Sequence, residues 1–215
     1  MKGILLAGGK GSRLNPMTFA VNKHLLPVYD KPMIYYSMSI LMLGGIRDIA
    51  LISNPEDQHL FQRLFGDGSR LGLNITYFVQ VEARGIPDAF LITQDWLQDD
   101  DVCLIFGDNI FFGESFGHKL SSAISELNGA TIFTQQVNNP QRFGVACFDE
   151  HDNITSLHEK PKEFISNHAI TGLYLFDNQV AKFAANTRPS GRGELEIMDV
   201  LEQYRQQQRL SHTTL

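Results

Sequence analysis

The chain has 215 residues, of which 43% are hydrophobic and 20% charged, a composition that excludes extended disorder and suits one domain spanning residues 1–215. Its formal net charge of −6 excludes a general affinity for nucleic acid or for an anionic membrane surface, because both partners are negatively charged. An anionic ligand would therefore have to be held by a few local cations.

The first apolar run, residues 4–7, is too short for a signal peptide, and no later stretch approaches the length of a membrane span. The two cysteines, Cys103 and Cys147, lie in strand-like apolar runs without metal-ligand spacing, which is typical of small buried side chains. We therefore expect a soluble, cytoplasmic protein.

Short apolar runs alternate with amphipathic stretches along the chain. They predict strands at residues 3–7, 48–53, 74–80, 102–107, 130–137, 144–149, 153–158 and 168–176. Helical periodicity occurs near residues 33–44, 55–65, 86–97, 114–127 and 194–208, and the last residues, RLSHTTL, look like the beginning of another strand. This alternation predicts a three-layer α/β sandwich, and the crowding of strands after residue 130 predicts a mixed or antiparallel part near one edge of the sheet.

A glycine-rich loop follows the first predicted strand, at the end of a strand where open α/β sheets bind ligands. Its pattern is Gly8-Gly9-x-Gly11-x-Arg13, with Lys23 ten residues further on. The pattern fits neither the P-loop nor the dinucleotide fingerprint. Glycines let backbone N–H groups approach phosphate oxygens, so the loop indicates either a triphosphate cradle or a tight turn with solvated cations.

Three further motifs stand near predicted strand or helix ends. In VCLIFGDN, Asp108 follows an apolar strand, where it suits Mg²⁺, although GDN alone is more often a plain turn. Lys160 lies in HEKP, and Arg192 precedes the last predicted helix in SGRGELE, where Glu194 could face neutral hydroxyls or complement the helix dipole. The histidines form no zinc-like cluster, and the absence of a G-x-S-x-G motif gives no support to a hydrolase.

Several of these segments together resemble one family. KGILLAGGKGSRLNPMTFAVNKHLLPVYDKPMIYYSMSILMLGGIRDI, FGDNIFFG, NNPQRFGVACFD, HEKP, TGLYLFDNQV and RPSGRGELEIMDV occur in the order found in the sugar-1-phosphate nucleotidylyltransferases, most closely the glucose-1-phosphate thymidylyltransferase branch. The resemblance implies a Rossmann-like nucleotidylyltransferase fold and a Mg²⁺-dependent reaction of dTTP with α-D-glucose 1-phosphate, giving dTDP-glucose and pyrophosphate. It also implies a homo-oligomer.

The resemblance also implies roles for individual residues. Catalytic roles fall to Arg13, Lys23 and Asp108, and Asp108 would be the metal ligand. The nucleotide would be bound by Leu6, Gly8, Gly9, Gly11, Arg13, Gln80 and Gly85, of which Gln80 and Gly85 match positions that meet the base. The sugar phosphate would be bound by Asn109, Gly144, Glu159, Lys160 and Arg192, with the last two on its phosphate.

The chain departs from the family pattern in a few places. His24 stands where Gln is usual, Phe143 replaces a usual Tyr, and GIPDAF at residues 85–90 replaces GLAQAF. Family members also usually continue beyond the position of Leu215 with a WLDTGT-like segment, whose aspartate is the second metal ligand, so we expect a C-terminally short domain. Two alternatives stay open: the same chemistry with UTP or another hexose 1-phosphate, and a catalytically weak relative that binds nucleotide or nucleotide-sugar.

Overall fold

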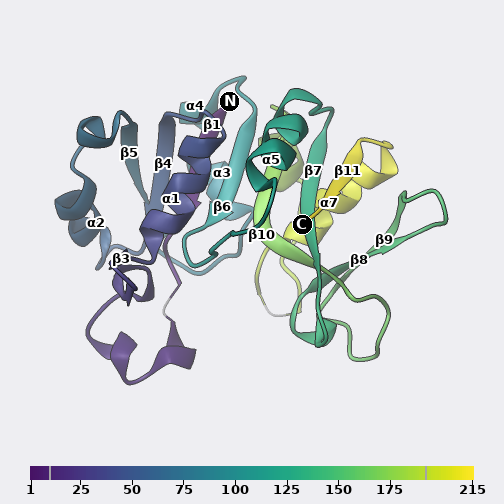
Figure 1. Cartoon of the computed structure of the whole chain (residues 1–215), viewed down its shortest axis with the longest axis horizontal. Helices are drawn as coiled ribbons and strands as arrows, with labels where there is room; N and C mark the ends of the chain where they lie inside the picture. Colours follow the sequence, from purple (N-terminus) through teal and green to yellow (C-terminus); the bar gives the residue numbers. More distant parts are fainter. Residues whose placement is uncertain (10, 192) are drawn as a thin grey trace.

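A computed structural model describes residues 1–9, 11–191 and 193–215. A nine-stranded mixed sheet forms its centre, with seven strands in the order β11-β7-β10-β6-β1-β4-β5 (Figure 1). The strands of this path are β1 (Lys2–Leu6), β4 (Asp48–Ser53), β5 (Asn74–Val79), β6 (Val102–Phe106), β7 (Ala130–Gln136), β10 (His168–Phe176) and β11 (Leu210–Thr214). The antiparallel pair β8 (Gly144–Phe148) and β9 (Ile154–Glu159) is attached to β10 through β8.

Helices cover both faces of the sheet, which confirms the predicted three layers. One core cluster joins the sheet to α1 (Ile34–Leu43), α2 (Gln58–Phe65) and α5 (Phe116–Ser125). The other joins it to α3 (Asp88–Ile92), α4 (Gln94–Leu97), α6 (Val180–Ala185) and α7 (Ile197–Gln206). Successive residues of β1 point to opposite faces, so Ile4 packs in the second cluster and Leu5 in the first, both fully buried.

The remaining elements are short. They are the pair β2 (Pro27–Val28) and β3 (Lys31–Pro32) and the 3₁₀ helices Ser12–Leu14, Met17–Phe19, Lys23–Leu25, Ser69–Leu71 and Pro140–Arg142. No helix in the described part of the chain is both long and apolar enough to cross a membrane.

The predicted strands agree with the structure to within one residue at either end. The strands after residue 130 lie on one side of β6 and include the antiparallel strands β8, β9 and β10, which confirms the expected mixed part; β10 itself is internal, between β6 and β7. The final residues do form a strand, β11, which pairs in parallel with β7. Helix α6 was not predicted, and the predicted helix over residues 86–97 is divided into α3 and α4.

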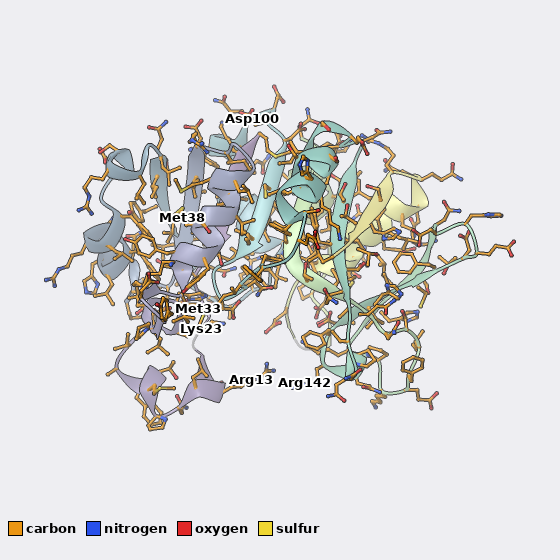
Figure 2. The ribbon with its side chains drawn as sticks, in the orientation of Figure 1. Arg13, Lys23, Met33, Met38, Asp100 and Arg142 are labelled. Carbon is orange, nitrogen blue, oxygen red and sulfur yellow. The ribbon has the colours of Figure 1, made fainter. Side chains whose placement is uncertain are left out.

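Because β1, β4, β5 and β6 are parallel, their carboxyl ends lie along the same edge of the sheet. The loop after β1 extends below this edge, and Figure 2 shows Arg13, Lys23 and Arg142 on that side of the molecule, with Asp100 at the opposite edge. The antiparallel direction of β10 brings its first residues, and the attached pair β8 and β9, to the same lower edge. Open α/β sheets bind their ligands at this edge.

Candidate active site

Two neighbouring pockets lie at the carboxyl ends of the parallel strands. The first is lined by Leu6, Gly8, Gly9, Lys23, His24, Gln80, Ala83, Gly85, Ile86, Phe106, Asp108 and Glu194. The second is lined by Gly11, Ser12, Arg13, Leu14, Lys23 and Asp108. Lys23 and Asp108 line both pockets, so one cation and one carboxylate stand at their junction.

The glycine-rich loop wraps the Lys23 side chain. A Cβ atom at Gly9 would lie 3.0 Å from Lys23 Nζ, and one at Gly11 would lie 2.8 Å from Lys23 Cβ. Gly11 also has a φ of 63°, which side-chain-bearing residues rarely adopt, and its carbonyl accepts a hydrogen bond of 2.8 Å from Thr18 Oγ1. The glycines therefore leave space for a lysine that reaches the pocket junction. Lys10, between them, lies outside the described residues.

Lys23 and Asp108 form an ion pair, in which Lys23 Nζ donates to Asp108 Oδ2. Asn109 Nδ2 donates to the other oxygen, Oδ1, at 2.9 Å. Burial alone raises the pKa of the Asp108 carboxyl, but the hydrogen bond and positive charge of Lys23 outweigh it, so the pKa lies below its usual range. Asp108 is therefore a carboxylate at neutral pH.

The donor set fits a magnesium ion that shares its coordination with a substrate. Among the described residues no group of three or more His, Cys, Asp or Glu side chains could hold a metal by itself. Mg²⁺ needs fewer protein ligands, because it is commonly bound through one or two carboxylates together with phosphates and water. Each oxygen of Asp108 has one protein donor and so keeps a lone pair for such an ion.

A buried polar network holds Lys23 in place. Asn22 is 7% exposed and its Nδ2 donates to Ala7 O at 3.2 Å and to Asp57 Oδ2 at 2.6 Å. Its Oδ1 accepts from the backbone N of His24 at 2.9 Å and from His24 Nδ1 at 2.7 Å. Burial, followed by the nearby charge of Lys23, lowers the pKa of His24 to about 3, so its ring is neutral. From the sequence, His24 was noted only because it stands where the family usually has Gln.

Gly85 connects the loop after β5 to the segment before α7. It has a φ of 101° and forms an isolated parallel bridge with Leu195, whose N donates to Arg84 O at 2.7 Å. A Cβ at Gly85 would overlap Leu195 O and lie 2.9 Å from Leu195 N. The bridge brings Glu194 into the lining of the first pocket. Because α7 begins only at Ile197, the helix-dipole interpretation of Glu194 is wrong.

Not every residue predicted for the sugar phosphate lies in these two pockets. Gly144 pairs with Glu159 across β8 and β9, and Lys160 Nζ lies 2.9 Å from Glu159 Oε1. None of the three lines either pocket. Arg192 lies outside the described residues.

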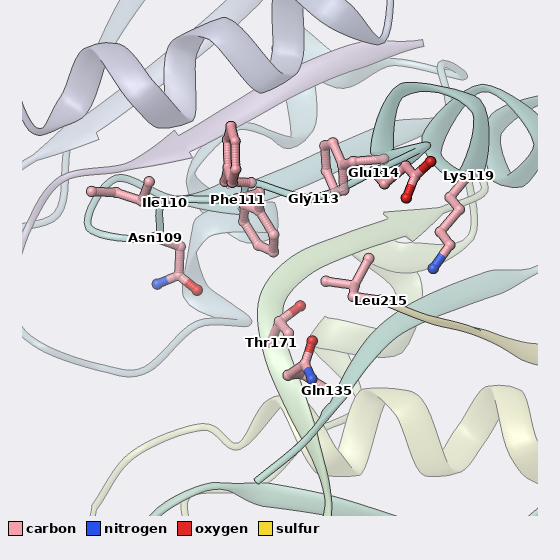
Figure 3. Close-up of a pocket in the computed structure, with 11 residues that line it drawn as sticks. Asn109, Ile110, Phe111, Gly113, Glu114, Lys119, Gln135, Thr171 and Leu215 are labelled. Carbon is pink, nitrogen blue, oxygen red and sulfur yellow. The ribbon is translucent and has the colours of Figure 1, made fainter.

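Asn109 faces a different hollow. Besides its bond to Asp108, its Oδ1 accepts from Gly172 N at 3.1 Å. Figure 3 shows it next to Ile110 at one end of a third pocket, which Phe111, Thr171 and Leu215 also line, between the loop after β6 and the C-terminal strand. Asn109 therefore lines neither of the two pockets that contain Lys23 and Asp108, and its contact with a sugar phosphate stays a prediction.

Sequence reasoning missed the apolar wall of the first pocket. Ala83, Ile86 and Phe106 form this wall with Leu6. Phe106 is the last residue of β6 and directly precedes the GDN motif, so its place at the strand end was a signal for a pocket residue. Ala83 and Ile86 follow β5 in a loop whose path depends on the Gly85–Leu195 bridge, a contact between residues 110 positions apart that no local pattern shows.

Comparison with known proteins gives matches along nearly the whole chain. The model of the family described as "Nucleotidyl transferase" matches residues 2–214. The chain belongs to the nucleotidyl transferase family. Among curated members it is 52% identical over 211 residues to the glucose-1-phosphate thymidylyltransferase of Neisseria meningitidis, covering 98% of this chain and 73% of that protein. It is 51% identical over 199 residues to the enzyme of the same name from Xanthomonas campestris, covering 93% and 68% respectively.

The structure also superposes on a solved structure of the family. A Bacillus anthracis protein described as a glucose-1-phosphate thymidylyltransferase, in complex with a sucrose, is 40% identical and superposes with a TM-score of 0.92. The match covers 100% of this chain and 87% of that one. The mixed sheet and its helical layers are thus those of the family.

Proposed function

We propose that the chain transfers a thymidylyl group from dTTP to the phosphate of α-D-glucose 1-phosphate, forming dTDP-glucose and releasing pyrophosphate. Family membership and the name shared by its close relatives support this assignment. The observation in the structure that carries it is the pair of pockets that meet at Lys23 and Asp108. One pocket combines an apolar wall with the amide of Gln80, and the other contains Arg13 and Ser12.

The first pocket suits the nucleoside of dTTP, and the junction suits its phosphates. Leu6 supplies apolar surface for a base, while Gln80 and Gly85 supply polar groups at one end. Gly8, Gly9 and Gly11 leave backbone and the Lys23 ammonium accessible beside them. In this proposal Arg13, an exposed residue in the second pocket, binds the leaving pyrophosphate through its planar guanidinium.

The chemistry is an in-line displacement at the α-phosphorus. An oxygen of the sugar phosphate forms a bond to that phosphorus as the bond to the bridging oxygen of pyrophosphate breaks. Two anions must come together, so neutralisation and alignment by Lys23 and Arg13 provide the main catalytic effect. A Mg²⁺ ion bound at Asp108 would supply further charge neutralisation on the phosphates.

The sugar phosphate is proposed to approach from the side of β8 and β9. Glu159 would accept hydrogen bonds from sugar hydroxyls, Gly144 would contact the sugar through its backbone, and Asn109 would orient the sugar. Lys160 and Arg192 would bind its phosphate. Lys160 supports this part of the proposal because its φ of 45° and its contact with Glu159 hold its charge at the end of β9.

Release of pyrophosphate tests the proposal. The purified chain with dTTP, glucose 1-phosphate and Mg²⁺ should release pyrophosphate, and Asp108→Ala should abolish it. Asp30→Ala, which removes an exposed carboxylate that also pairs with a lysine, is the matched control and should leave the rate unchanged. A panel containing UTP and other hexose 1-phosphates will show whether dTTP and glucose 1-phosphate give the highest kcat/KM. If no pair of nucleotide and sugar phosphate leads to release of pyrophosphate, but calorimetry shows that dTTP binds, the chain is a nucleotide-binding protein and not an active enzyme.

A homo-oligomer and a cytoplasmic location complete the proposal. Around the third pocket Phe112 is fully exposed and Ile110 is 46% exposed, which supports burial of this surface against a second copy. Light scattering on the purified chain should then give a mass above the 24.2 kDa of one chain. The cytoplasm is the compartment in which dTTP would be available to it.

A further inference from the structure

The amide of Gln80 is held between two acceptors. Its Nε2 donates to Gly85 O at 3.1 Å and to Asp88 Oδ2 at 3.0 Å. Both hydrogens of that nitrogen are therefore used. The opposite orientation would place Oε1 against a carbonyl and a carboxylate, neither of which can donate, so the arrangement of acceptors determines which way the amide points.

This orientation directs the oxygen of Gln80 toward the first pocket. Oε1 lies 3.8 Å from the place that a Cβ at Gly8 would occupy, so it faces the end of β1. Among the described residues no group donates a hydrogen bond to Oε1, and Gln80 lines the pocket. The pocket thus offers a ligand a hydrogen-bond acceptor, and not a donor, at this position.

Asp88 is the part of this arrangement that can be altered. Gly85 O belongs to the backbone, whereas Asp88 is a side chain at the first turn of α3 and is only 4% exposed. Its other oxygen, Oδ1, lies 3.4 Å from Arg84 Nη1, and the Arg84 side chain is 57% exposed. Asp88 thus connects the first turn of α3 to the amide in the pocket.

We propose that Asp88 is a positioning residue that fixes Gln80 with its oxygen toward the pocket, and that it thereby selects nucleobases with an N–H at ring position 3. Thymine and uracil carry such a donor. Cytosine carries a lone pair at that position, which would face the lone pair of Gln80 Oε1. The inference rests on the proposed function, because it takes the first pocket as the place of the base.

Removing the acceptor should release the amide. In Asp88→Leu only Gly85 O still fixes the amide, so Gln80 can flip and turn Nε2 toward the pocket, where an N–H can meet the lone pair of cytosine. We expect the ratio of kcat/KM for dTTP to that for dCTP to fall by about tenfold or more, the effect of roughly one hydrogen bond gained or lost. A purely structural role would lower both values together and leave the ratio unchanged.

Two control variants isolate the acceptor. Asp88→Asn keeps an oxygen that can accept from Gln80, because the exposed Arg84 can turn from the new amide toward water. The ratio should stay within about threefold of wild type, a smaller change than the loss of one hydrogen bond would cause. Arg84→Gln removes the ion pair and leaves the carboxylate, so it should also keep the ratio. If Asp88→Leu does not fold, Asp88→Ser, which is too short to reach Gln80, takes its place.

The readouts separate this proposal from the proposed function. The same ratio is measured as dissociation constants for dTTP and dCTP by calorimetry, which requires no turnover. If the wild-type protein binds dTTP but releases no pyrophosphate, the proposed function is wrong, while the ratio of dissociation constants still tests the role of Asp88. An unchanged ratio in a folded variant that lacks the acceptor would overturn the role of Asp88. Absence of binding of either nucleotide to wild type would overturn both.

Discussion

Substitution of Gly85 by Ala should damage both stability and nucleotide binding. At a φ of 101° an L side chain is strained, and its Cβ would overlap the carbonyl oxygen of Leu195, a backbone atom that cannot rotate away. The positive φ costs about 1–2 kcal/mol. Relief of the overlap costs roughly 1–3 kcal/mol more. We therefore expect the free energy of unfolding to fall by about 2–5 kcal/mol.

Two other glycines provide matched controls for this prediction. Gly72 has a φ of 68° and nothing within 4 Å of a Cβ, so Gly72→Ala should show only the cost of the positive φ. Gly129 has the same φ of 101° and a similar overlap with Arg209 O, but it precedes β7 at the opposite edge of the sheet. Gly129→Ala should therefore lose as much stability as Gly85→Ala while binding dTTP normally.

The assays are urea unfolding for stability and calorimetry for dTTP binding. A domain has about 5–15 kcal/mol of stability, so the variants should fold well enough to measure. Gly85→Ala should bind dTTP at least about tenfold more weakly, the effect of about 1.4 kcal/mol, because the bridge to Leu195 shapes the pocket. If it unfolds like Gly72→Ala, the close approach of Gly85 and Leu195 is refuted.

Three other predictions follow from the same structure. Lys23→Met should lower pyrophosphate release by about 100-fold or more, because it removes the cation at the pocket junction, whereas Lys31→Met on an exposed pair should have no effect. Burial raises the pKa of the Cys103 thiol to about 12. Iodoacetamide at pH 8 should therefore label Cys147 and leave Cys103 unlabelled in the folded protein, which mass spectrometry can measure. Rapid labelling of Cys103 would contradict its burial. Tyr204→Phe removes a hydrogen bond of 2.6 Å to Asp177 and should lower unfolding free energy by about 1–3 kcal/mol in urea while kcat/KM stays unchanged.

The sequence was sufficient for those parts of the fold that depend on local pattern. The apolar run at residues 102–106 and the closing RLSHTTL predicted strands because their residue types and length are sufficient signals. The predicted helix over residues 86–97 was divided because Thr93 is buried and its Oγ1 donates to Ala89 O at 2.7 Å, with a φ of −100° that leaves the helical region.

Long-range contacts set the limit of sequence reasoning. The last helix was predicted from residue 194, but residues before Ile197 are drawn into the bridge with Gly85. The glycine-rich loop and the GDN motif line the same pocket, as their places at strand ends predicted, because the strand ends of a parallel sheet meet at the same edge. The buried network of Asn22 and His24 could not be predicted, because it depends on side chains brought together only by the folded loop.

The internal position of β10 has a consequence for how this site can change. In the sheet the strands that carry the first pocket, β1, β5 and β6, are joined to the strands that carry Gly144 and Glu159 through the pairing of β6 with β10. Insertions or exchanges in the β8 and β9 hairpin therefore leave the register of β1, β4 and β5 intact. The fold is in this sense modular: under the proposed function, one half could acquire a new acceptor molecule while the other keeps its nucleotide.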